Sequence, residues 1–173
     1  SFKETKHTDE IFELVKHLNI GSGLIQRKDD RLELAELNIM AGNAAKKSTA
    51  FLAALSYFET AKSLFTKEEL ILEPQKHFSL LMEQATAALL SGDLLKADDI
   101  CENLSNIAKS NLEKGAVSNI KVLILIFQGK LFETIAEIRK TLLLFNITLP
   151  ETDEEIGRRT QEGVMKMQQY LAA

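Results

Sequence analysis

The chain has 173 residues, 45% of them hydrophobic and 27% charged, which excludes a disordered chain and suits one soluble domain with a sizeable core. Its formal net charge of −4 argues against nucleic-acid binding, because no basic excess exists to neutralise phosphates. The longest apolar run, Val122 to Phe127, is far shorter than the roughly 20 residues that span a bilayer, so we expect no membrane insertion.

Apolar residues recur at helical spacing almost throughout, as in Ile11, Leu14, Val15 and Leu18, and this pattern predicts an all-α fold. Glycine and proline are scarce, which favours long helices joined by short turns. We expect eight helices, and a short extra turn near 67–72. Their expected ranges are 9–26, 30–47, 50–65, 75–91, 94–109, 113–128, 131–146 and 153–171.

Several of the expected helix ends have side chains that suit them. Thr66–Glu69, Ser110–Glu113 and Thr152–Glu155 match the capping box, in which a hydroxyl and a carboxylate accept from backbone amides. Gly92 and Gly129 stand where a helix must stop, since glycine adopts the left-handed conformation of a helix end without penalty. Turns this short make each helix antiparallel to the next.

Small and apolar residues recur in one register when Gly92 is aligned with Gly129. The matched sets are Gly42, Ala85 and Val122; Ala54, Ala97 and Thr134; Phe58, Cys101 and Ile138. Small residues at fixed positions let two helices approach closely, which is the pattern of tetratricopeptide repeats. The repeats are degenerate, because they lack tryptophan and because their spacings of 43 and 37 residues exceed the usual value of about 34.

The register predicts one domain, 1–173, folded as a right-handed α-α superhelix of TPR-like helical hairpins. We place repeats at 35–68, 78–111 and 115–148. The helices at 9–26 and 153–171 are then expected to be caps, which cover apolar faces that terminal repeats otherwise expose.

Five strings carry a more specific likeness: His17–Gly21, Arg31–Asn38, Ala41–Ser48, Ala53–Phe58 and Asn146–Pro150. Together they resemble the tetratricopeptide-like region of large signalling proteins. In that family a Ser/Thr-kinase-like domain and an AAA-type predicted ATPase precede the region, and a GAF sensor and a histidine kinase follow it. The resemblance implies that the region links catalytic modules and that ATP and phosphotransfer belong to the parent kinase. It implies no catalytic residue here.

Motifs that might bind a cofactor or metal are incomplete. Gly21-Ser-Gly23 lacks the third glycine of a dinucleotide fingerprint, and Gly42 to Thr49 lacks the Gly-Lys-Ser/Thr ending of a phosphate loop. His7, His17 and His77 have no metal-ligand spacing with one another or with Cys101. We therefore expect no catalytic, cofactor or metal site. The single cysteine excludes an intramolecular disulfide and fits a reducing, cytoplasmic location.

The sequence thus favours a non-catalytic interaction or scaffold segment that contacts neighbouring domains of its own chain or another protein. The first helices of the repeats are expected to form a largely uncharged groove for an amphipathic helix or extended segment. Its expected residues are Glu36, Ile39, Asn43, Lys46, Lys47, Met82, Thr86, Leu89, Asn119, Leu123 and Phe127.

Three alternatives stay open from the sequence. The chain could be a stand-alone TPR-like adaptor, or a small helical enzyme or ligand-sensing domain with a pocket between hairpins. The apolar runs Val122–Phe127 and Leu142–Phe145 are expected to lie mostly in the core, and an exposed patch that contacts a neighbouring domain or a second copy, as in a homodimer, is the alternative for them. Because the chain starts with Ser1, we expect a fragment of a longer protein.

Overall fold

The computed structural model describes the backbone of residues 2–171 and the side chains of residues 11–171. This part of the chain is all-helical and contains no strand, which confirms the predicted class. The α-helices are α1 (Phe2–Ile20), α2 (Lys28–Lys47), α3 (Phe51–Ser63), α4 (Lys67–Leu72), α5 (Pro74–Leu90), α6 (Leu94–Ile107), α7 (Asn111–Phe127), α8 (Leu131–Leu143) and α9 (Asp153–Leu171). A short 3-10 turn, η1 (Ser22–Leu24), follows α1.

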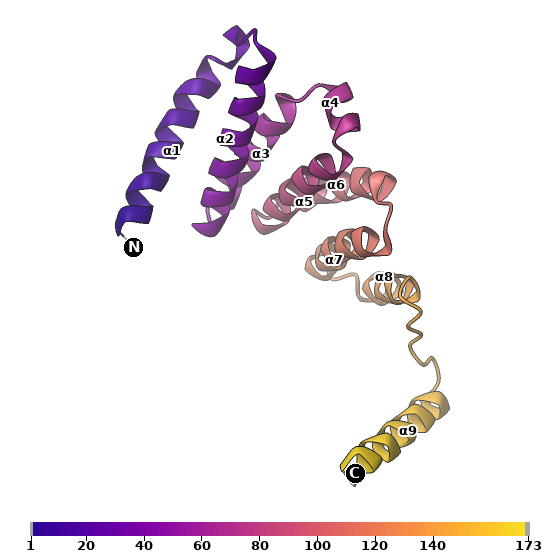
Figure 1. Ribbon diagram of the computed structural model, residues 1–173. Helices are drawn as coiled ribbons and strands as arrows, with labels where there is room; N and C mark the ends of the chain where they lie inside the picture. Colours follow the sequence, from indigo (N-terminus) through magenta and orange to yellow (C-terminus); the bar gives the residue numbers. More distant parts are fainter. Residues whose placement is uncertain (1, 172–173) are drawn as a thin grey trace.

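Six of the helices form three successive hairpins: α2 with α3, α5 with α6, and α7 with α8. Helix α5 packs against α3 of the preceding hairpin, and α7 packs against both α5 and α6. Helix α1 covers α2, and the short α4 lies beside α5. Figure 1 shows the hairpins following one another in a curved row, with α9 standing apart at the end of an extended linker.

Two segments differ from the expected helices. Helix α1 begins at Phe2 and ends at Ile20, whereas we expected 9–26. It ends early because the glycine-rich segment turns into η1, where the Leu24 amide donates to the Gly21 carbonyl at 2.9 Å. The expected extra turn at 67–72 is a complete helix, α4, which the Thr66 and Glu69 capping box starts.

The first helix of each hairpin ends in the same way, with one residue in the left-handed conformation. Gly92 has φ of 87° and Gly129 has φ of 71°, as expected for glycine at a helix end, and Thr49 has φ of 59°. After each of these residues, the next amide donates back to the helix at 2.9 Å: Ala50 to Ala45, Asp93 to Ala88, and Lys130 to Leu125. The three hairpin turns therefore share one geometry.

The predicted capping boxes of Thr66 and Ser110 are both complete. At α9 only the hydroxyl half forms, since Thr152 Oγ1 accepts from the Glu155 amide at 3.2 Å. The Glu155 carboxylate accepts from the amide of Glu151, one residue earlier than the box requires.

Phe58 of α3 holds the first two hairpins together. Its side chain is 0% exposed, and its ring lies directly against Gly42 of α2, where a Cβ would come within 2.5 Å of the ring. The Phe58 carbonyl accepts from the buried Gln84 side chain of α5 at 2.8 Å. A single residue therefore joins α2, α3 and α5.

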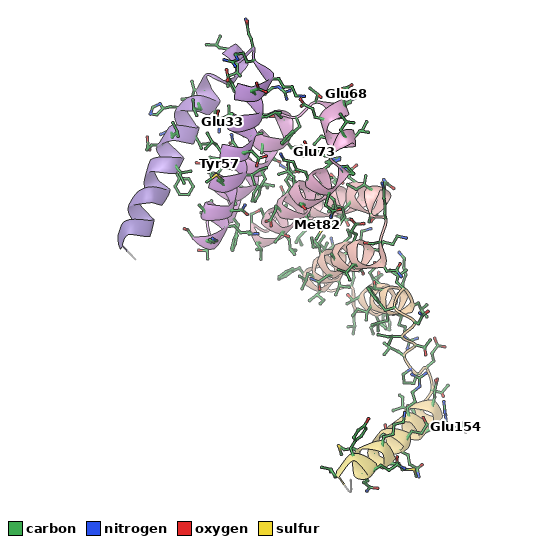
Figure 2. All side chains as sticks on the ribbon, viewed as in Figure 1. Glu33, Tyr57, Glu68, Glu73, Met82 and Glu154 are labelled. Atoms are coloured by element: carbon green, nitrogen blue, oxygen red, sulfur yellow. The ribbon has the colours of Figure 1, made fainter. Side chains whose placement is uncertain are left out.

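Polar pairs fix the helices at the start of the row. Asn19 of α1 and the buried Asn38 of α2 exchange two amide hydrogen bonds, each 2.8 Å long. Arg31 of α2 binds the Glu69 carboxylate with both terminal nitrogens, at 2.9 and 2.7 Å. The Arg31 hydrogen bonds and the Thr66 amide lower the pKa of Glu69 to about 2. On the α3 side, Tyr57 stacks on Phe12 of α1 with ring centroids 5.8 Å apart (Figure 2).

Thr49→Gly should stabilise the chain. A β-branched residue at φ of 59° is strained, and glycine removes that strain at some cost in unfolded-state entropy, for a net gain of about 0.5–1 kcal/mol. Urea unfolding monitored by circular dichroism measures this gain. The matched control is Gly92→Ala in the equivalent turn, which should lose about 1 kcal/mol. A destabilised Thr49→Gly chain would contradict the shared turn geometry.

Gly42→Ala should destabilise the chain by about 1–3 kcal/mol through overpacking against Phe58, although alanine is the better helix former. Urea unfolding again gives the value. Gly163→Ala is the control, since a Cβ at Gly163 meets no atom within 4 Å, and it should be neutral or stabilising. The double variant Gly42→Ala/Phe58→Leu should lose less unfolding free energy than the sum of the two single variants, because the smaller leucine leaves room for the alanine. Strict additivity of the two changes would show that the glycine and the ring do not interact.

Candidate interaction surface

The residues predicted for a partner groove lie on α2, α5 and α7, the first helices of the three hairpins. The structure gives them three degrees of burial. Glu36, Lys47, Asn119, Leu123 and Phe127 are exposed, and Ile39, Asn43, Lys46, Met82 and Thr86 are half-buried, whereas Leu89 is buried.

The prediction for Leu89 is wrong. Its side chain is only 6% exposed and belongs to the main hydrophobic core. Helix α5 is packed against α3, α4, α6 and α7, so it turns fewer side chains to solvent than a helix at either end of the row. Its neighbour Leu90 is exposed instead.

Two charged members of the predicted groove are engaged within the fold. Glu36 of α2 forms an ion pair with Lys76 of α5, and Lys46 of α2 forms one with Glu83 of α5. These pairs connect the first helices of two successive hairpins. The predicted face is therefore less charged toward a partner than its sequence suggests.

A groove also lies between α7 and α8, at the end of the row, and it shares Asn119 with the predicted set. It encloses a cavity of about 310 Å³ lined by Gly115, Ser118, Asn119, Val122, Ile138, Thr141 and Leu142. Earlier in the row, α7 itself packs against both helices of the preceding hairpin, α5 and α6. The groove between α7 and α8 is the part of the third hairpin that corresponds to the surface of α5 and α6 on which α7 packs.

Burial at one repeated position shows that this groove lacks a cover. Phe58, Cys101 and Ile138 occupy the same register position in the three hairpins. Phe58 and Cys101 are 0% exposed, whereas Ile138 is 37% exposed. Ile138 is exposed because, within the described residues, no following helix packs on the third hairpin as α5 and α7 pack on the first two.

Exposed apolar side chains are frequent on α7, on α8 and on the linker that follows. Helix α8 has one buried residue, Thr134, and the rest of its apolar residues are half-buried or exposed. The exposed apolar residues of this end are Leu123, Ile126, Phe127, Leu131, Phe132, Ile135, Ile138, Leu143, Phe145, Ile147 and Leu149. We call this groove with its apolar rim the terminal groove.

The polar groups near the terminal groove bind one another within the hairpin. Ser118 Oγ, which is buried, donates to Glu137 Oε1 at 2.9 Å and also contacts Thr141 Oγ1. Thr141 Oγ1 donates to the Glu137 carbonyl at 2.8 Å. A second cavity on the other side of these groups, of about 190 Å³, is lined in part by Lys114, Lys121 and Lys140. It is smaller than the roughly 300 Å³ at which ligand pockets usually begin.

The residues considered as metal ligands or phosphate-binding groups do not form a common site. His17 is exposed and lies 3.8 Å from Glu13, while burial and Lys62 lower the pKa of His77 on α5. The side chain of His7 lies outside those described. Within residues 11–171, no group of three or more His, Cys, Asp or Glu side chains could hold a metal ion. Gly42 lies within the helix α2, as expected, which leaves no phosphate loop there.

Cys101 should be unreactive in the folded chain. Burial raises the pKa of its thiol to about 11, so the thiolate fraction at pH 8 is roughly one in a thousand. Iodoacetamide labelling at pH 8, followed by mass spectrometry, should be at least a hundredfold slower for folded chain than for chain in 6 M guanidinium, because burial also blocks access. Rapid labelling of the folded chain would contradict the buried, protonated thiol.

A curated relative is similar to this chain. It is the hybrid signal transduction histidine kinase G of Dictyostelium discoideum, 31% identical over an alignment of 121 residues that covers 65% of this chain and 4% of the relative's length. The chain therefore spans only a small part of that protein. No family model and no solved structure matches the chain. Among the described helices, none combines the length and the apolar character needed to cross a membrane.

Sequence reasoning considered part of the terminal groove only as an alternative. It placed the runs Val122–Phe127 and Leu142–Phe145 mostly in the core, whereas Ile126, Phe127, Leu143 and Phe145 are exposed. It missed the α8 face around Ile138, because apolar residues at helical spacing look like core in a single sequence. The register position of Ile138 could have indicated this face, since the third expected repeat, 115–148, is followed by the single helix expected at 153–171.

Proposed function

We propose that this chain is a non-catalytic interaction segment of a signalling protein, and that its terminal groove binds an amphipathic helix. The observation that carries the proposal is the exposure of Ile138 at a position that is fully buried in the two preceding hairpins. Each earlier hairpin is covered by a helix that packs on it, so a helix is the shape that completes the third.

The likeness to part of a histidine kinase supports a role in signal transduction. We further propose that the hairpins form a TPR-like right-handed superhelix in the cytoplasm. In this proposal the chain links ATPase and sensor or histidine kinase modules of a longer protein, and these modules carry the chemistry. The bound helix then belongs to a neighbouring domain or to another protein, without a cofactor in this segment.

The character of the groove favours an apolar helix over a charged peptide. Val122, Ile138 and Leu142 line it, and an acidic tail would instead require a clamp of lysine and arginine side chains. A stand-alone adaptor could use the same surface. The predicted face of α2, α5 and α7 continues into this groove, because its exposed apolar residues Leu123 and Phe127 lie at the rim of the terminal groove.

A library of amphipathic helical peptides, displayed on phage and selected on the full chain, tests the terminal groove. Selected peptides should have apolar residues at i, i+3 or i+4, and i+7, and Ile138→Glu should weaken their binding at least tenfold. Leu95→Glu is the control, because Leu95 is an exposed apolar residue on α6, outside the groove. Selected helices that bind equally to the wild type and to Ile138→Glu would overturn the proposal. Ile135→Glu, also at the rim, replaces Ile138→Glu if that variant fails to fold.

A further inference from the structure

Helix α9 is amphipathic and has no buried side chain. Ile156, Thr160, Val164, Met167 and Leu171 follow one another at intervals of three or four residues, so they form one stripe along the helix. All five are exposed. Figure 2 shows α9, with Glu154 near its start, apart from every other helix drawn. We expected the helix at 153–171 to cap the last repeat. In this structure α9 buries none of its side chains and covers no hairpin.

A helix of this composition needs a surface to pack on. Gly157 and Gly163 lie within α9, and each glycine costs about 1 kcal/mol relative to alanine in a helix. A helix of 19 residues with mostly polar side chains is only marginally stable by itself in water. Most helical stability in proteins comes from packing an apolar face, which α9 does not do in this arrangement.

The terminal groove has the properties of that surface. It continues the series in which each further helix packs on the preceding hairpin, and α9 is the next helix along the chain. The stripe of α9 provides apolar side chains at the spacing that groove binding requires. If α9 lies antiparallel to α8, its acidic first turn, Asp153 to Glu155, falls near Arg139 and Lys140 at the end of α8.

The linker holds α9 away from the groove of its own chain. Arg159 of α9 donates to the Thr148 carbonyl at 2.6 Å and to its hydroxyl at 3.1 Å. Arg139 of α8 pairs with Glu151 of the linker at 3.0 Å. The linker contains Pro150 and no glycine, so it resists a sharp reversal. In Figure 1 the linker accordingly separates α8 from α9.

We propose that α9 of one copy docks in the terminal groove of a second copy, and that the exchange is reciprocal. This inference rests on the proposed function, since it names the helix that fills the groove. A reciprocal exchange closes with two-fold symmetry and fills both grooves, whereas one docked helix would leave a groove open. Two docked helices bury twice the surface area that one buries. This brings the interface closer to the roughly 1,200 Å² or more that a stable interface buries.

Cross-linking between two singly substituted chains tests the exchange. One chain has Ile138→Cys in the groove, and the other has Val164→Cys in the α9 stripe. Mixed and treated with a short bismaleimide, they should give a product of twice the chain mass. The wild-type chain should give none, because Cys101 is buried. A third chain has both substitutions and is treated at high dilution. If α9 docks in the groove of its own chain, this variant gives a cross-linked monomer. The monomer product without the mixed product would overturn the exchange and leave the proposed function standing.

The mass of the chain in solution gives an independent measure. Val164→Glu places a charge in the stripe and should weaken dimerisation at least tenfold, as measured by size exclusion with light scattering over a concentration series. Gln169→Glu adds the same charge on the opposite face of α9 and should leave dimerisation unchanged. A wild-type chain that stays monomeric at 100 μM would overturn the exchange, and the peptide library would still decide whether the groove binds helices.

Discussion

The contact between Phe58 and Gly42 is the constraint on which the arrangement of the other helices depends. The ring fits only because α2 has no side chain at this point, so α2 and α3 approach closely. The same residue offers its carbonyl to Gln84, which fixes where α5 packs. Because α5 in turn contacts α6 and α7, the position of the later hairpins follows from this one buried residue. The asparagine pair of Asn19 and Asn38 adds α1 on the other side.

The same register position changes its role along the chain. In the first two hairpins Phe58 and Cys101 are completely covered, and in the third Ile138 is left partly open. The residue type alone does not explain this difference, since isoleucine is at least as apolar as cysteine. The cause is the place of the hairpin in the row. An apolar residue at a position that is buried in the earlier hairpins stays partly exposed when no following helix packs on its own hairpin.

Local patterns in the sequence were enough to predict most helices and their ends. Helical spacing placed α2 to α8, and Gly92 and Gly129 marked the turns, because these features depend on a few neighbouring residues. Thr49 was missed as a left-handed turn residue, since threonine rarely adopts that conformation. The pairing of Arg31 with Glu69 joins residues far apart in sequence, and single-sequence patterns contain no signal for it. Leu89 was misplaced because burial depends on how many helices surround α5.

The titratable groups of this chain are used to hold helices in place. Glu69 is kept ionised by Arg31 and by its own helix cap, and burial keeps the Cys101 thiol protonated. Neither state suits a group that must exchange protons near neutral pH, where catalytic groups are usually poised. What the chain leaves free is apolar: the terminal groove on α7 and α8, and the stripe on α9. Both surfaces lie after the second hairpin, so the apolar faces that the fold leaves open are gathered at one end of the row.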